Sequence, residues 1–484
     1  MTSKYLPTIG LEIHAELKTA SKMFCSSKND PDEEKPNVNI CPICLGHPGT
    51  LPVLNMEAIK HVLKVGVAVS GTLADFTEWD RKNYFYPDIP KGYQISQHKY
   101  PLVSDGALAG VELDRIHLEE DTARSTHDQH EKSLVDFNRS GVPLLELVTK
   151  PVIHDAATAV HFAKELQLLL RYLGAGEANL EKGEMRVEAN ISIASEADTK
   201  NKKFGTKTEV KNLNSFRSVE RAIEYELGRQ TSLLENGESV VQETRGWDDR
   251  KGETYSQRSK ESSHDYRYFP DPDIPKLKLS ELADFSATSL KKSLPELPWQ
   301  KRERFKKDFD MTDKEVAVFV ENDFLRAYFE QALKFLSSDK KKIRLFINYL
   351  LTDYTALLKE KIGNSYLHID TAAIMPVRFV ELIDMIAGGK VSSAGAKKIL
   401  AHMIDDKDAS PQVIAEKNNL IQKNDSKSLL PAIEKVIADN AAVVAEYKSG
   451  KTASLQYLIG QAMKATEGAG NPEIVRKILL EKLG

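Results

Sequence analysis

The sequence predicts an α+β domain with a largely antiparallel sheet, followed by two all-α domains. Residues 1–293 combine short β-rich stretches, loops rich in Gly, Pro and Asn, and helical segments in no regular order. Because strands and helices do not alternate regularly, a parallel α/β arrangement is disfavoured. From residue 294 onward the pattern is almost entirely helical, which predicts a bundle at 294–404 and a smaller helical domain at 405–484. A length of 484 residues fits about three domains.

Helical periodicity places three helices in the first domain. They are expected at 57–69, 156–173 and 218–235. Asp155 is a suitable N-cap for the second of them, and Gly174 marks its end. The proline-rich segment 269–275 can be neither helix nor central strand, so we expect an extended loop there.

The helical domains follow from similar local signals. The bundle is expected to contain helices at 314–322, 323–336, 341–358, 376–387 and 393–403. In the last domain, Asn471-Pro472-Glu473 combines an N-cap, a proline at the first helical position and an acid in the first turn. This combination predicts the start of the last helix.

The overall composition limits the protein class. Hydrophobic residues make up 41% of the chain and charged residues 29%, as in soluble globular proteins. The net charge of −4 means that any nucleic acid must be bound through local basic patches. No apolar run is long enough for a membrane helix, and the N-terminus lacks the apolar core of a signal peptide, so we expect a cytoplasmic protein that does not contact a membrane.

The segment 8–19 carries the clearest functional signal. If it is a strand, Glu12, His14 and Glu16 point to one face while Leu11 and Ile13 point to the other. Two carboxylates and an imidazole on one face are suited to holding a divalent metal. A half-solvated strand with an ordinary polar face is the alternative.

Three further segments favour a metal–phosphate site. Acids end the segment 115–121, and acids alternate with basic or amide side chains in 184–192 and 207–214. The residues concerned are Glu119, Glu120, Glu184, Arg186, Glu188, Asn190, Lys207, Glu209 and Lys211. Acids hold Mg²⁺ through oxygen ligands, and Lys and Arg neutralise phosphate oxygens.

The three cysteines are grouped in the sequence. Cys41 and Cys44 form a C-x-x-C pair, and Cys25 precedes them. Three cysteines in so long a chain argue against a disulfide framework. The open alternatives are a zinc site and three reduced thiols that need no metal.

These motifs carry a family resemblance. The chain contains six motifs in this order: IGLEIHAELKT, RKNYFYPDIPKGYQISQ, HLEEDTARSTH, DFNRSGVPLLELVT, KTEVKNLNSF and DYRYFPDPDIP. Together they closely resemble the B subunits of aspartyl/glutamyl-tRNA amidotransferases over about residues 5–275. The closing MKATEGAGNPEIV is similar to that family's tail.

The resemblance implies an activity and roles for particular residues. The family uses ATP and magnesium to phosphorylate the side-chain carboxylate of a misacylated Glu-tRNA(Gln) or Asp-tRNA(Asn), and ammonia then displaces the phosphate. The implied metal ligands are Glu12, His14, Glu119, Glu120, Glu188 and Glu209, although some members have Asp where Glu188 stands. Lys82, Lys207 and Lys211 are the implied residues that neutralise the charge of phosphate or carboxylate groups, and Arg186 and Asn212 orient them. Tyr84 and Tyr86 either flank the acceptor end of the tRNA or are core aromatics beside Phe85.

The resemblance also implies partners and a possible zinc ion. The chain lacks a Ser-Ser-Lys amidase signature, so ammonia comes from the family's amidase A subunit, with a small C subunit completing a heterotrimer. Lys448, Lys451 and Lys464 in the tail are candidates for tRNA contact, or ordinary surface lysines. Some members place C-x-C before the C-x-x-C to give four zinc thiolates, whereas this chain has Cys25-Ser26-Ser27. The missing fourth position could be filled by His47, a water or nothing.

Two other classes of function remain as alternatives. A tRNA-binding module without chemistry would turn over no ATP. A metal-dependent phosphohydrolase would release phosphate without any aminoacyl-tRNA. The sequence does not separate Glu-tRNA(Gln) from Asp-tRNA(Asn) as the substrate.

Overall fold

The computed structural model describes residues 4–127, 132–201, 203–259, 266–336, 338–362, 372–406, 409–422, 426–466 and 470–484. Asp265 and residues 467–469, which belong to the motifs quoted above, lie outside these ranges. The chain forms two compact units, Met1–Pro298 and Trp299–Gly484. The finer boundary between residues 404 and 405 stays a prediction.

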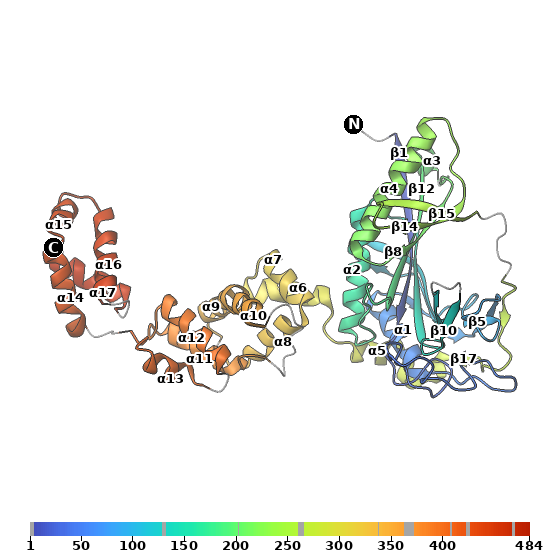
Figure 1. The fold of residues 1–484 in the computed structure, drawn as a ribbon, viewed down its shortest axis with the longest axis horizontal. Coiled ribbons are helices and arrows are strands. Elements are labelled where there is room, and N and C mark those ends of the chain that lie inside the picture. The colour runs from blue at the N-terminus through green and yellow to red at the C-terminus, as the bar shows by residue number, and fades with distance from the viewer. Residues whose placement is uncertain are drawn as a thin grey trace. The chain divides into compact units, whose positions relative to one another are not determined.

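A ten-stranded sheet organises the first unit (Figure 1). Its order is β15-β14-β13-β12-β1-β11-β8-β6-β2, with β7 paired to β8. Neighbouring strands run antiparallel except for β13 and β14, which are parallel, so the predicted α+β class with a largely antiparallel sheet is confirmed. The strands are β1 Tyr5–Glu16, β2 Thr72–Leu73, β6 Val103–Ser104, β7 Ala107–Leu108, β8 Val111–Glu120, β11 Pro143–Thr149, β12 Met185–Ser195, β13 Thr208–Leu213, β14 Glu243–Asp248 and β15 Glu253–Ser259.

Short ribbons complete the first unit. They pair β9 (Arg124–His127) with β10 (Ser133–Asp136), β4 (Asp80–Asn83) with both β5 (Tyr93–Ser96) and β16 (Phe269–Pro270), and β3 (Phe76–Thr77) with β17 (Leu277–Lys278). The segment 269–275 therefore includes a two-residue strand at its start, in accord with the restriction of proline to strand edges.

The three helices expected in this unit are present. They are α1 Met56–Ala68, α2 Ala156–Tyr172 and α4 Phe216–Glu235, and the shorter α3 Glu196–Lys200 and α5 Ala287–Ser293 accompany them. Asp155 caps α2 by accepting the Thr158 N–H at 2.7 Å. α2 and α4 pack against each other, and they contact β1 and β12 respectively. They cover the apolar face of the sheet, which leaves its other face for polar side chains.

Every named element of the second unit among its described residues is a helix, and one isolated antiparallel bridge joins Val391 and Ile421. Its helices are α6 Pro298–Phe309, α7 Asp313–Glu321, α8 Asp323–Ala332, α9 Lys340–Tyr349, α10 Thr355–Ile362, α11 Pro376–Ala387, α12 Ser393–Asp405, α13 Pro411–Lys417, α14 Ser426–Asp439, α15 Ala441–Lys448, α16 Ala453–Ala465 and α17 Pro472–Leu483. The helix predicted at 341–358 is divided by a π-helical stretch, Leu350–Tyr354. The predicted start of α17 is confirmed, because Asn471 accepts the Glu473 N–H at 3.0 Å.

Two hydrophobic cores stabilise this unit. One is a set of mutually contacting aromatic rings that are fully buried: Phe305, Phe319, Tyr328, Phe329, Phe346 and Phe379. The other is built from α14, α16 and α17 within residues 429–483. Of the described helices, none is both long and apolar enough to cross a membrane.

Replacing Phe346 by alanine should destabilise the helical unit by about 3–5 kcal/mol, because the ring is fully buried and its loss leaves a cavity. Phe335→Ala is the matched control, since that ring is 53% exposed and should change stability by no more than about 0.5 kcal/mol. Urea unfolding followed by far-UV circular dichroism measures both. Equal effects in the two variants would contradict the assignment of the aromatic core.

The Glu315–Arg344 ion pair should make the stability of the helical unit depend on pH under acidic conditions. The hydrogen bond from Arg344 is the main reason that the pKa of Glu315 is lowered from 4.5 to about 2. Since the folded pKa is below the unfolded one, the stabilisation is complete above pH 4.5 and is lost as the pH falls towards 2. Solvent reaches both side chains, so we expect about 1 kcal/mol. Glu315→Gln keeps the capping hydrogen bonds with Thr312 and should remove this acid loss in urea titrations at a series of pH values.

Candidate functional site

The polar face of β1 is the centre of the candidate site. Burial alternates along this strand: Leu11 and Ile13 are buried, whereas Glu12, His14 and Glu16 are only partly covered. The alternation confirms the expected strand and the shared face of its acids and imidazole. β1 lies between β11 and β12, so both of these strands can add side chains to this face.

Glu12 belongs to a group of three carboxylates. Glu188 lies opposite Glu12 on β12, Glu209 extends from β13, and a carboxylate oxygen of each lies within 4.8 Å of the others. Lys211 Nζ lies 2.7 Å from Glu188 Oε2 and 3.5 Å from Glu209 Oε1. Burial and repulsion from Glu146 and Glu188 raise the pKa of Glu12. One lysine among three acids leaves excess negative charge, and such oxygen donors fit Mg²⁺.

A second group surrounds the imidazole of His14. His14 Nε2 lies 3.3 Å from Glu146 Oε2 and 3.6 Å from Glu119 Oε1. Glu146 Oε2 also lies 3.1 Å from the Nε2 of His117. Burial favours the neutral ring, but the hydrogen bond and charge of Glu146, with Glu119, raise the pKa of His14 to about 9. A divalent cation bound here would replace the proton of His14, because metal-bound imidazole is neutral.

The sequence analysis did not identify Glu146 or His117 as site residues, although a feature of the sequence points to each of them. Glu146 is the only charged residue in the strand PLLELVT, and a charge in an otherwise apolar strand needs a buried partner. His117 precedes Glu119 by two residues, so both share one face of β8. The register places His14, Glu146 and His117 side by side across β1, β11 and β8.

Glu120 does not lie with these groups. Adjacent residues of a strand point to opposite faces, so Glu119 faces His14 while Glu120 points the other way. Glu120 Oε1 accepts the Ile95 N–H at 3.0 Å and a hydrogen bond from Lys91. Both acids are buried, but only Glu119 joins the groups that could hold an ion.

Two of the predicted lysines lie beside the acids. Burial opposes the charged form of Lys82, yet the charge of Glu119 above all raises its pKa. In the same way Glu188 and Glu209 raise the pKa of Lys211 against the effect of burial. Both side chains are therefore ammonium groups at neutral pH, placed next to the carboxylates.

A bulge in β13 sets the positions of Lys211 and Asn212. The register of β12 and β13 shifts between Val187 and Ala189, so that both residues of β13 face the single residue Glu188. Asn212 takes up the bend with a left-handed φ of 66°, a conformation that Asn tolerates. Its side chain is exposed.

Arg186 is held by a different acid. Arg186 Nη2 lies 2.8 Å from Asp121 Oδ2, and the Nε of Arg139 lies 3.7 Å from the same oxygen. Asp121, mainly through the charge of Arg186, keeps a lowered pKa in spite of its burial. Next to it, burial and repulsion from Asp121 raise the pKa of Glu16 to about 8. Arg186 thus lies directly opposite His14 on β12, and its guanidinium is directed to Asp121.

A cavity of about 340 Å³ continues the polar face at the opposite end of β1. Thr8 and Asn190 line it from β1 and β12, and Phe204 and Lys207 line it from the following loop. The buried oxygens Thr8 Oγ1 and Asn190 Oδ1 have no hydrogen-bond partner among the described residues. Lys207 therefore lies at this cavity, separate from the lysine among the three carboxylates.

The tyrosines differ in their environment. Tyr84 is partly buried, and its ring centroid lies 6.1 Å from that of Tyr266. Tyr86 is 67% exposed and Phe85 is 83% exposed. The core-aromatic alternative is therefore wrong for Phe85 and Tyr86, because both rings face solvent.

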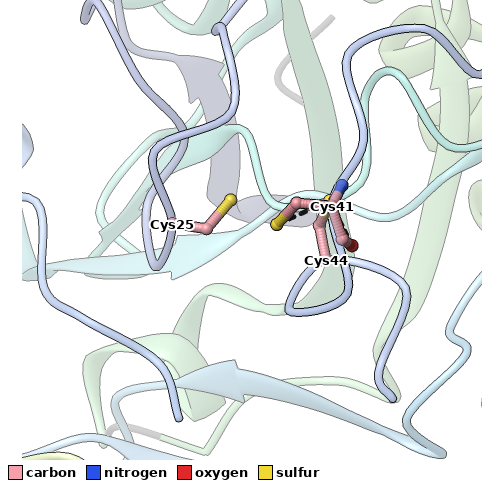
Figure 2. Close-up of side chains that lie close together, drawn as sticks. All are labelled: Cys25, Cys41 and Cys44. Carbon is pink, nitrogen blue, oxygen red and sulfur yellow. Dashed lines mark hydrogen bonds between the residues drawn. The ribbon is translucent and has the colours of Figure 1, made fainter. Parts of the chain in front are cut away.

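The three cysteines converge in space, as Figure 2 shows. Their sulfur atoms all lie within 4.8 Å of one another, and those of Cys41 and Cys44 are 3.8 Å apart. A hydrogen bond with Cys25 is the main reason that the pKa of Cys44 is lowered to about 5, while the pKa of Cys25 is raised. Such soft donors fit a thiophilic metal such as zinc.

The tail lysines lie at the surface. Lys448 ends α15, Lys464 lies in α16, and both are exposed. Lys451 Nζ lies 2.9 Å from Glu446 Oε2, so an acid of the same domain already compensates this charge.

The fold and the acid-lined face define a GatB/GatE catalytic domain, whose family model matches residues 7–283. A second model, the GatB domain, matches residues 327–483. The chain is 41% identical to the B subunits of aspartyl/glutamyl-tRNA(Asn/Gln) amidotransferase from Thermodesulfovibrio yellowstonii and Caldicellulosiruptor saccharolyticus, covering 99% of each chain. The protein of the same name from Myxococcus xanthus is also 41% identical, over 100% of this chain and 99% of its own. The chain belongs to this family of B subunits.

Glu146→Gln should weaken the binding of a divalent cation at least about tenfold, or about 1.4 kcal/mol, because it removes the carboxylate shared by both imidazoles. Mn²⁺ binding measured by electron paramagnetic resonance is a direct readout. Glu112→Gln is the matched control on the same sheet, since that side chain is 62% exposed and pairs with Lys150. Unchanged affinity in Glu146→Gln would remove the His14 group as a metal site.

Proposed function

We propose that this chain is the B subunit of a tRNA-dependent amidotransferase, a glutamine-hydrolysing, ATP-dependent carbon–nitrogen ligase. It phosphorylates the side-chain carboxylate of Glu-tRNA(Gln) or Asp-tRNA(Asn) and replaces the phosphate with ammonia. The products are Gln-tRNA(Gln) and Asn-tRNA(Asn), which are used in protein synthesis. The observation that carries the proposal is the row of acids along one face of β1, with Lys82 and Lys211 beside it.

The chemistry requires a charged, pre-arranged site. A carboxylate is a poor electrophile, so ATP converts it to an acyl phosphate, and the reacting phosphates must lie close to the substrate anion. Lys82 and Lys211 are fixed ammonium groups that reduce the repulsion between these anions. Mg²⁺, when bound by Glu12, Glu188 and Glu209 or by Glu12, His14 and Glu146, would spread the phosphate charge.

We assign the nucleoside of ATP to the cavity that contains Phe204 and Lys207. Its unpartnered oxygens, Thr8 Oγ1 and Asn190 Oδ1, suit hydroxyl or amino groups of a ligand. Asn190 follows Glu188 by two residues on the same face of β12, so the phosphates would extend from the cavity towards the acids. Half-exposed Phe204 offers a ring for stacking.

Ammonia and tRNA bring further components to the proposal. The absence of an amidase signature implies a glutaminase partner, and the family resemblance makes this the A subunit of a heterotrimer with a small C subunit. We assign contact with an unpaired base of the tRNA acceptor end to Tyr86, which is exposed, and Tyr84, which is half-buried. The domain proposed at 405–484, through Lys448, Lys451 and Lys464, contacts the tRNA body.

Glu209→Ala should reduce ATP-dependent amide formation by at least about a hundredfold in the reconstituted complex, because Lys211 and any bound cation lose this carboxylate. Glu238→Ala is the control, because it removes an exposed acid from the same unit and should leave the activity unchanged. Amidation is measured with each misacylated tRNA, using glutamine or free ammonium. Ammonium should restore no activity to Glu209→Ala, whereas it should bypass the need for the glutaminase partner in the unchanged chain. Full activity of Glu209→Ala would refute the site.

Ending the chain after Gln422 should weaken tRNA binding by about tenfold, or about 1.4 kcal/mol. The removed helices have their own core, so the rest of the protein should fold. The removed residues 423–484 include nine basic and seven acidic residues, and this small net charge limits the electrostatic part of the contact. Affinity of the complex at two salt concentrations is the measurement, with Mn²⁺ binding as the control for an intact site. Equal tRNA affinity with and without the tail would place recognition elsewhere.

A further inference from the structure

Thr244 lies one strand beyond the three carboxylates of Glu12, Glu188 and Glu209. β13 and β14 run parallel, and Thr244 is the residue of β14 that lies opposite Glu209. Its hydroxyl donates to Glu209 Oε2 at 2.7 Å, so the side chain is directed to the polar face of the sheet. Thr244 belongs to none of the motifs that the sequence analysis connects with the site, yet it contacts a candidate metal ligand directly.

This hydrogen bond gives the two oxygens of Glu209 different neighbours. Oε2 accepts from Thr244, and Oε1 lies 3.5 Å from Lys211 Nζ. The last torsion of a glutamate side chain has a broad energy minimum, so the plane of a carboxylate is poorly defined unless its neighbours hold it. Only 14% of the Glu209 side chain is exposed, so water competes little for the same oxygens. The Thr244 hydroxyl therefore fixes the direction in which the lone pairs of Glu209 point.

Thr244 is itself held on both sides and from below. Its strand pairs with β13 on one side and with β15 on the other, where Arg258 lies opposite Thr244. The next residue, Arg245, points to the other face and donates to Thr254 Oγ1 at 2.8 Å. Thr254 Oγ1 donates in turn to the buried Glu226 of α4 at 3.1 Å. Because branching at Cβ also restricts the first side-chain torsion of threonine, the hydroxyl of Thr244 has a defined position.

The same arrangement recurs in the group around His14. Ser96 Oγ donates to Glu119 Oε2 at 2.9 Å, and Glu119 Oε1 lies 3.6 Å from His14 Nε2. In both groups a hydroxyl from another strand holds one oxygen of an acid, while the other oxygen faces a cationic side chain. Ser96 is 2% exposed, so its replacement would also disturb packing. Thr244 is only partly buried, which makes it the better residue for an experiment.

We propose that Thr244 is a positioning residue, whose hydroxyl orients Glu209 for the divalent cation that acts in phosphoryl transfer. This role rests on the proposed function, because it requires that Glu209 holds that cation. Thr244 acts through Glu209. Removing such a hydrogen-bond partner of a metal ligand typically lowers metal affinity by about 10- to 100-fold.

Thr244→Val tests the role, because valine keeps the branched shape of threonine and lacks the hydroxyl. Mn²⁺ binding to the full-length chain, measured by electron paramagnetic resonance, should weaken about tenfold. In the reconstituted complex, the Mg²⁺ concentration that gives half-maximal amide formation should rise by a similar factor, whereas the rate at saturating Mg²⁺ should stay close to that of the unchanged chain. Thr244→Ser restores the hydroxyl and should restore both values. Thr244→Ala should reproduce the effect of Thr244→Val, so the test does not depend on the folding of one variant.

Thr231→Val is the matched control in the same unit. The Thr231 hydroxyl also donates at 2.7 Å, but its acceptor is the Leu227 carbonyl within α4. The control should change neither the Mn²⁺ affinity nor the Mg²⁺ requirement. An effect of equal size in Thr231→Val and Thr244→Val would show a general loss of stability instead of a role in positioning.

Two further results would overturn the role of Thr244. They are unchanged Mn²⁺ affinity in Thr244→Val, and a Thr244→Ser variant that is as impaired as Thr244→Val. Glu209→Ala separates these failures from a failure of the proposed function. Full activity of Glu209→Ala refutes the site itself, whereas an inactive Glu209→Ala together with a normal Thr244→Val refutes the role of Thr244 alone.

Discussion

Buried charge along one face of β1 is the constraint on which the first unit depends. A desolvated carboxylate is stable only where cations or hydrogen bonds compensate it. Along β1, the negative charge near Glu12, near His14 and near Glu16 is compensated by different cationic side chains. Lys211 serves Glu188 and Glu209 next to Glu12, the imidazoles of His14 and His117 serve Glu146, and arginines serve Asp121 next to Glu16. The pKa of Glu12 is raised and that of Glu16 is raised to about 8, so burial outweighs this compensation at both acids.

The sheet makes this concentration of charge possible because its two faces are separated. Leu11 and Ile13 are directed to the side that α2 and α4 cover, and the intervening polar residues stand on the other side. A register slip by one residue would exchange the faces and bury the acids against the helices, so the register is strongly specified. The bulge in β13 is the local exception, and it brings Lys211 to Glu188.

The helical unit follows other rules. Its aromatic core and the separate core within residues 429–483 are apolar, and its ion pairs lie largely at the surface. Surface ion pairs contribute little to stability, so the stability of this unit depends mainly on the packing of its apolar cores. Under the proposed function the two units have different tasks. Phosphoryl transfer requires charged groups held in fixed positions, whereas contact with tRNA requires a surface that fits a large RNA.

Local sequence patterns predict several helices, the first strand and many of the candidate residues. Periodicity predicts α1, α2 and α4, the Asn471-Pro472 signal predicts α17, and alternation predicts β1 with Glu12 and His14 on one face. These features depend on neighbouring residues, so a single chain segment contains the necessary information. The sequence-based prediction named both Glu119 and Glu120 as metal ligands, although adjacent residues of a strand point to opposite faces.

Which side chains meet depends on contacts between segments that are distant in the sequence. His117 and Glu146 join His14 because β8, β11 and β1 pair in one register, and these strands are far apart in the sequence. In the same way, Lys207 lies at a cavity and Arg186 pairs with Asp121, although both belong to motifs with the metal-ligand candidates. Long-range strand pairing and the packing of loops set these distances, and a local sequence pattern does not encode them.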